Sequence, residues 1–248
     1  MSKKLLTFGF VALLALGSVS CAKLQARDQL IKGQQAFKNA KYESAVDHFK
    51  QAMELDPNLT MAELYLGTAY SQQFIPGAQS PENQKMAELA IQTFENILTR
   101  EPSNVSAIAG LAFMYQNTFQ FQKAHEFYLK QAQLDQQNPV PFYAVASVDW
   151  IMVSNKAEPP PLEEQIKLVD EGITYADKAL ALNQDYDEAM SYKNLLLREK
   201  ARLAETEDQK ALLTKQADDW FTKALDTRKK NQEKKVKAAQ GITVESPK

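Results

Sequence analysis

The chain carries few side chains of the kinds that perform catalysis. Its only two histidines, His48 and His125, fall on separate predicted helices, and acidic pairs such as Asp218 and Asp219 are adjacent on a helix, so their carboxylates point apart. The sequence contains no zinc-protease motif, no nucleophile elbow, no glycine-rich phosphate loop and no pair of closely spaced cysteines. We therefore expect no enzyme, no cofactor and no metal site.

Cys21 is a candidate for covalent modification. It is the only cysteine of the chain, so it can form no internal disulfide. It follows Lys3, Lys4, an apolar run over residues 5–16 and small residues over 17–20. This arrangement is typical of a secretory signal peptide. The apolar run is about twelve residues long, whereas a transmembrane helix needs roughly 20, so residues 1–20 are predicted to be removed on export.

The position of Cys21 resembles the lipobox of bacterial lipoproteins, although Ser18 stands where that family usually has leucine. The resemblance implies that the Cys21 sulfur receives a diacylglyceryl group and that residues 21–23 form the lipidation site and a short tether. Several acyl chains would anchor the protein stably. Ala22, in place of aspartate, implies an outer membrane lipoprotein that faces the periplasm. The alternative is an ordinary signal peptide and a soluble periplasmic or secreted product.

The charge balance excludes one large class of partner. Removal of residues 1–20 takes away two lysines and no acid, which leaves 27 of 29 Lys and Arg residues against 31 Asp and Glu residues. Nucleic-acid-binding domains are usually basic, so we expect no nucleic-acid partner. The residues that dominate the chain are good helix formers, and no segment shows the alternation typical of a strand.

Small and aromatic residues recur with a spacing close to 34. Gly33 and Gly67 are 34 residues apart, as are Ala90 and Ala124. Leu66-Gly67 is followed by Tyr70, and Pro57 and Pro102 each lie twelve residues after the alanine of their repeat. In four places an alanine is followed four residues later by an aromatic side chain: Ala45 and Phe49, Ala90 and Phe94, Ala124 and Tyr128, Ala217 and Phe221.

These residues resemble the motif of the tetratricopeptide repeat (TPR) family. The resemblance implies an all-α protein, a right-handed α-solenoid of about five antiparallel helix pairs. The residue types support it, because small residues such as Gly33, Gly67 and Ala90 let paired helices approach closely. Aromatic side chains then fill the space between them: Tyr70, Phe94, Tyr115 and Tyr128. A single pair cannot bury its apolar face, so neighbouring pairs must stack.

The solenoid is predicted to span residues 24–228, followed by a basic, flexible tail over 229–248. Its five helix pairs are expected at about 24–56, 60–100, 103–135, 140–182 and 185–227. The fourth pair is degenerate, since Trp150 and Gly172 replace the usual tyrosine and alanine. The fifth has about eleven extra residues without Pro or Gly, which predicts a long helical hairpin.

In the TPR family the first helix of each pair lines a concave groove that binds a peptide or a partner helix. The matching positions in this chain are Gln34, Phe37, Lys38, Thr68, Ser71, Gln72, Phe113, Gln116, Asn117, Val148, Ile151 and Met152. Amides and hydroxyls can bond a ligand backbone and apolar side chains can form pockets. The groove is therefore expected to be polar near its N-terminal end and apolar near its C-terminal end, unless the fifth pair covers the apolar residues.

The hypothesis that follows is a membrane-tethered TPR scaffold of the bacterial cell envelope that binds partner proteins or peptides and assembles envelope complexes. A second hypothesis is a small-molecule-binding carrier subunit associated with a transporter. An enclosed apolar cavity beneath Trp150 would favour the carrier, and an open groove would favour the scaffold.

Overall fold

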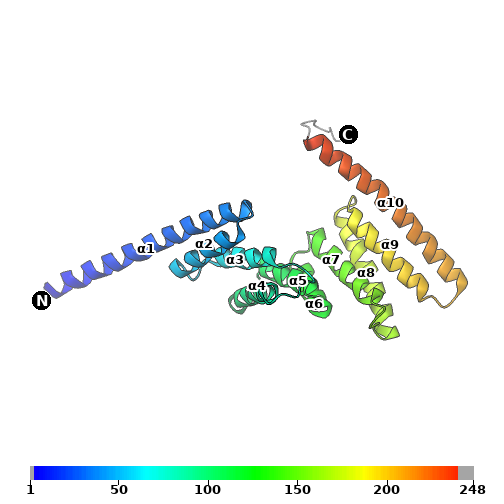
Figure 1. The fold of residues 1–248 in the computed structure, drawn as a ribbon, viewed down its shortest axis with the longest axis horizontal. Helices are drawn as coiled ribbons and strands as arrows, with labels where there is room; N and C mark the ends of the chain where they lie inside the picture. The colour runs from blue at the N-terminus through cyan, green and yellow to red at the C-terminus, as the bar shows by residue number, and fades with distance from the viewer. Residues whose placement is uncertain (1–2, 240–248) are drawn as a thin grey trace. The chain divides into compact units, whose positions relative to one another are not determined.

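A computed structural model describes the backbone of residues 3–239 and the side chains of residues 21–239. This part of the chain contains ten α-helices and no strand (Figure 1). The helices are α1 (Lys3–Lys38), α2 (Tyr42–Leu55), α3 (Thr60–Gln73), α4 (Pro81–Arg100), α5 (Val105–Asn117), α6 (Phe121–Leu134), α7 (Pro139–Ser154), α8 (Leu162–Leu182), α9 (Asp187–Arg202) and α10 (Glu207–Ala239). The signal-peptide prediction lies on residues whose side chains the structure does not describe. The all-α fold is confirmed.

Polar side chains start several of the helices. The Ser80 and Asn104 side chains accept hydrogen bonds from the backbone N–H groups of Asn83 and Ala107, at the starts of α4 and α5. Asn138 caps α7 in the same way, and Pro139 occupies its first position. Caps of this kind satisfy backbone donors that a helix start leaves unpaired. These caps therefore fix where α4, α5 and α7 begin.

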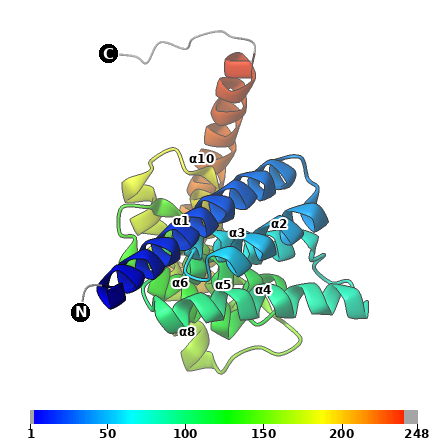
Figure 2. The same cartoon turned by 90° about the vertical axis from the view of Figure 1, so that its left-hand side faces the viewer.

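The chain forms two compact units, residues 1–119 and 120–248, and each is described by itself. In the first unit, α1 packs on α2, α2 on α3, α3 on α4 and α4 on α5. The first repeat helix was expected to begin near residue 24, but α1 is one continuous helix from Lys3 (Figures 1 and 2).

Close helix packing in the first unit depends on glycines that face aromatic rings. A Cβ atom at Gly33 would lie 2.4 Å from the Phe49 ring, and one at Gly67 or Gly110 would lie 2.8 or 2.5 Å from the Phe94 ring. Such distances are shorter than van der Waals contact, so only glycine fits without a shift. Phe94 is therefore held between α3 and α5. The predicted role of small residues opposite aromatic side chains is confirmed here.

The second unit contains α6 to α10. Helix α7 contacts α6, α8 and α9, and α9 contacts both α8 and α10. Its fully buried side chains include Val145, Val148, Val169, Met190 and Leu196. Helices α7 and α9 thus each have three neighbouring helices, and α7 carries several of the buried side chains.

The end of α10 corrects one prediction. Residues 229–239 are helical and not a flexible tail, while residues 240–248 lie outside the described part. Arg228 Nε donates to Asp187 Oδ2 at 2.9 Å, and Asn231 Nδ2 donates to Asp187 Oδ1 at 2.9 Å. Lys234 pairs with Asp185 at 3.2 Å. Because these residues lie beside the start of α9, the basic segment continues the helical hairpin (Figure 1).

Candidate functional site

The first unit contains a surface groove between α3 and α5, with a volume of about 470 Å³. Four of the predicted groove residues line it together: Thr68, Ser71, Gln72 and Phe113. The other lining residues are Met61, Leu64, Tyr65, Phe94, Ser106, Ala109 and Gly110. Two large apolar side chains are exposed on its walls, Met61 on α3 (48% exposed) and Phe113 on α5 (46%).

The spacing of the lining residues explains the shape of the groove. Met61, Tyr65, Thr68 and Gln72 follow one face of α3 at intervals of four, three and four residues. Sequence reasoning missed Met61 and Tyr65. They lie seven residues before Thr68 and Gln72, and residues seven apart share one face of a helix. Phe94 also lines the groove but is only 3% exposed, so it forms the floor.

Polar groups of the groove differ in what they can still bind. The Thr68 hydroxyl donates to Leu64 O at 2.8 Å and the Ser71 hydroxyl donates to Gly67 O at 2.9 Å, both within α3. Their oxygens can therefore accept a hydrogen bond from a ligand but not donate one. Ser71 is buried, whereas the Gln72 side chain is exposed. Gln72 is thus the amide best placed to contact a ligand backbone.

Other predicted residues of the first unit lie outside this groove. Phe37 packs edge-on against Tyr42 and Tyr65, with ring centroids 5.4 and 6.3 Å apart. Asn117 Nδ2 donates to Phe113 O at 2.8 Å within its own helix. Gln34, Lys38 and Gln116 are at most partly buried and do not line the groove.

The predicted apolar end of the groove on α7 is not an open surface. Val148 is fully buried, which rules out contact with a ligand. Ile151 is half-buried, and Met152 packs against Val153, Leu168 and Val169. Helices α6, α8 and α9 all pack on α7, which leaves little of its surface open. The burial of Val148 is compatible with the alternative in which the fifth helix pair covers the apolar residues.

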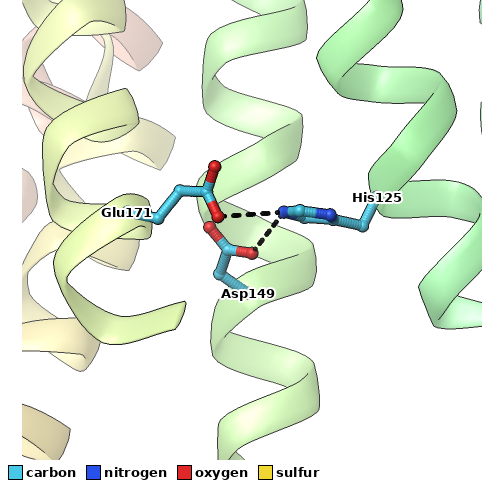
Figure 3. Close-up of side chains that lie close together, drawn as sticks. All are labelled: His125, Asp149 and Glu171. Atoms are coloured by element: carbon cyan, nitrogen blue, oxygen red, sulfur yellow. Dashed lines mark ion pairs between the residues drawn. The ribbon is translucent and has the colours of Figure 1, made fainter. Parts of the chain in front are cut away.

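A second group of functional side chains lies in the second unit, where His125 on α6, Asp149 on α7 and Glu171 on α8 converge (Figure 3). His125 Nε2 is 3.0 Å from Asp149 Oδ1 and 3.5 Å from Glu171 Oε2. The exposed fractions of the side chains are 11% for His125, 0% for Asp149 and 24% for Glu171.

The buried environment shifts the pKa values of this cluster. Burial raises the pKa of Asp149 to about 6, against the opposite effect of His125. Burial lowers the pKa of His125, but the Asp149, Glu171 and Glu126 carboxylates outweigh it and raise that pKa above its usual value. Sequence reasoning missed the cluster. A usable signal was Asp149 itself, the only acidic residue in the otherwise apolar helix α7.

The predicted lipidation residue is accessible, since Cys21 is a free, exposed thiol on α1. Its neighbours Lys23, Leu24 and Arg27 share a shallow surface pocket with it. Within the described residues, none of the helices combines the length and apolar character needed to cross a bilayer.

Comparison with known proteins gives structural matches only. No protein-family model matches the chain, and no curated protein sequence matches it significantly. A MamA crystal structure superposes with a TM-score of 0.61 at 16% identity, covering 90% of this chain and 98% of the other. MamA from Desulfovibrio magneticus RS-1 gives 0.62 at 14% identity, covering 83% and 96%. YrrB, a TPR protein with an unusual peptide-binding site, gives 0.55 at 15% identity, covering 81% and 90%.

These neighbours are TPR proteins, and they match the chain over most of its length and of theirs. Identities below 20% carry information on the fold alone. Together with the glycine and aromatic contacts between the paired helices, they lead to one conclusion: the chain has the fold of the tetratricopeptide repeat proteins.

Proposed function

We propose that the protein is a non-enzymatic scaffold that binds a segment of a partner protein in the groove between α3 and α5. The observation that carries the proposal is the pair of exposed apolar side chains, Met61 and Phe113, on opposite walls above the Phe94 floor. Exposed apolar side chains around a concavity are typical of a binding surface. The exposed Gln72 amide supplies a polar contact beside them.

The chemistry of the groove favours a peptide or a helix with apolar anchor residues. The Thr68 hydroxyl oxygen can accept a hydrogen bond from a backbone N–H group of an extended peptide. A peptide-binding site in the TPR protein YrrB is consistent with this use of the fold. Trp150 packs against Ala146, Ala176 and Leu196, so side chains occupy the place where a carrier would enclose a solute. We therefore do not propose the carrier function.

A photo-crosslinking amino acid at residue 113 tests the scaffold proposal in cells. We expect it to capture a defined partner, and we expect Met61→Glu on the opposite wall to abolish the capture. The matched control is a crosslinker at Leu225, an exposed apolar residue of α10 (47% exposed). Equal capture from residues 113 and 225, or capture that Met61→Glu leaves unchanged, would contradict groove binding.

We further propose that the protein is exported, lipidated at Cys21 and tethered to the outer membrane, facing the periplasm, where it assembles envelope complexes. Support comes from the signal-like residues 1–20 and from the exposure of Cys21. Metabolic labelling with a fatty-acid analogue should mark the wild-type protein and the Ala22→Ser control, but not Cys21→Ser. Unlabelled wild-type protein in the soluble periplasmic fraction would exclude the tether.

A further inference from the structure

We propose that His125, Asp149 and Glu171 bind a first-row divalent transition-metal ion of the Zn²⁺ class. The three side chains come from three consecutive helices, α6, α7 and α8, and their ligand atoms lie within 4.8 Å of one another (Figure 3). One imidazole nitrogen and two carboxylate oxygens are ligand types that Zn²⁺ accepts. The groove of the first unit is not part of this site.

The two distances from His125 Nε2 to the carboxylate oxygens fit tetrahedral coordination. Two ligands at the usual Zn–N and Zn–O distances of about 2.0–2.2 Å lie about 3.4 Å apart in a tetrahedral site. His125 Nε2 lies 3.0 Å from Asp149 Oδ1 and 3.5 Å from Glu171 Oε2, which bracket that value. Glu171, the most exposed of the three side chains, has the freedom to adjust around an ion.

Asp149 provides an independent observation that points to a ligand. Its side chain is completely buried and points toward His125 (Figure 3). Among the described residues, neither carboxylate oxygen has a hydrogen-bond donor in acceptable geometry, and the same holds for His125 Nε2. A buried carboxylate without such donors is costly in free energy. A cation placed between the three side chains would satisfy these atoms directly.

The charges around the site favour a cation. With a protonated imidazole, the two carboxylates leave the cluster with a net charge of −1. A neutral imidazole with a divalent ion brings the total to zero. Glu126 adds a further negative potential at His125. A divalent ion therefore compensates the buried carboxylates better than a proton on His125 does.

The site is rigidly supported and still open to solvent at one edge. Gly172 lets α8 approach α7 closely, since a Cβ there would lie 3.1 Å from the Asp149 Cβ. This approach places the neighbouring Glu171 opposite His125. The partial exposure of Glu171 and His125 gives the ion a path of entry and leaves room for a water molecule as a fourth ligand.

Calorimetric titration of the metal-free full chain with Zn²⁺ tests the proposal, in a Cys21→Ser background that removes the exposed thiol. We expect one Zn²⁺ per chain, a higher thermal midpoint with Zn²⁺ than with Mg²⁺, and visible absorption of a four-coordinate site with Co²⁺. Asp149→Asn and Glu171→Gln should each weaken binding by about 10-fold or more, since even outer partners of metal ligands contribute that much.

The second histidine of the chain offers a matched control. His48 is hydrogen-bonded to Gln29 at 2.8 Å in the first unit, so His48→Gln should bind Zn²⁺ like the parent, whereas His125→Gln should not. Asp149 is buried, so Asp149→Asn could fail to fold. Glu171 is the most exposed of the three residues, so Glu171→Gln can be tested even in that case. Lack of saturable Zn²⁺ binding by His48→Gln would overturn the proposal. Undiminished binding by both carboxylate variants would do so as well, because the ion would then be bound elsewhere.

Discussion

Gly172 on α8 lies directly against Asp149 on α7, and a methyl group at residue 172 would come within 3.1 Å of the Asp149 Cβ and 2.8 Å of Leu196 Cδ1. The glycine stands where the repeat pattern has an alanine. Its absent side chain allows the fully buried Asp149 carboxylate to lie between α6 and α8. The glycine that makes the fourth repeat degenerate is therefore the residue that makes room for the charged cluster.

The first prediction concerns this contact. Gly172→Ala should lower the free energy of unfolding by about 1–3 kcal/mol, because overpacking outweighs the roughly 1 kcal/mol that alanine gains over glycine in a helix. Urea unfolding followed by circular dichroism measures the change. Leu196→Val shortens the side chain nearest to the new methyl group, so the double variant should lose less than the sum of the two single losses. A stabilised Gly172→Ala protein would contradict the close approach.

A second prediction concerns Phe94, which is 3% exposed and lies between Gly67 and Gly110. Phe94→Ala should destabilise the protein by about 3–5 kcal/mol, because it removes a buried ring and leaves a cavity under the groove. Phe221→Ala is the matched control, since that ring is 48% exposed, and its cost should stay below about 1 kcal/mol. Similar losses in the two variants, measured by chemical unfolding, would show that Phe94 does not hold α3 and α5 together.

A third prediction separates a packing residue from a binding residue. Val148→Ala should cost about 1–3 kcal/mol of stability, because the side chain is completely buried, and should leave capture of a partner from residue 113 unchanged. Phe113→Ala should change stability by less than about 1 kcal/mol, because the ring is 46% exposed, but should weaken partner binding. Unfolding curves of both variants check the stability effects. Partner capture is measured from a crosslinker at residue 113 in Val148→Ala and from a crosslinker at residue 72, which lines the same groove, in Phe113→Ala. If the folded Val148→Ala variant no longer captured a partner, α7 would have to be counted among the helices that bind it.

The fourth prediction is a pH dependence at Asp187. Burial raises its pKa, but hydrogen bonds from Arg228 and Asn231 outweigh burial and lower the pKa below its ordinary value. The charged form is thus favoured in the folded state, so its stabilisation is complete above the unfolded pKa of about 4 and is lost as the pH falls through the lower folded-state pKa. Asp187→Asn should cost about 1 kcal/mol at pH 7, a modest value because Arg228 is half-exposed.

Unfolding free energies at several pH values test this dependence. The difference between wild type and Asp187→Asn should shrink as the pH falls below about 4, where the wild-type carboxyl becomes protonated. Asp226→Asn serves as the control, because Asp226 is an exposed residue of the same α10 helix that carries Arg228. A difference that stays constant with pH would mean that the carboxylate charge does not stabilise the end of α10.

Features that depend on residues close together in the sequence could be predicted, whereas the surroundings of individual side chains, which depend on other helices, could not. Phe37 and Ser71 were assigned to the groove from the same place in successive repeats, yet Phe37 packs with Tyr42 and Tyr65 while Ser71 lines the groove. Equivalent positions on two helices therefore have different surroundings. The residues near 230 show the same effect, since this helical segment contacts Asp185, which precedes α9, and Asp187 at the start of α9.

The sequence alone determined the all-α repeat fold and the opposition of glycines to aromatic rings, because helix formation and packing within a pair depend on residues a few turns apart. Tertiary structure alone decided that Val148 on α7 is buried, that Met61 and Phe113 line the same groove, and that His125 meets two carboxylates. The physical reason is that these contacts join side chains of different helices, several of them from different repeats. Their distances depend on how closely each helix approaches the next, which the contact at Gly172 illustrates.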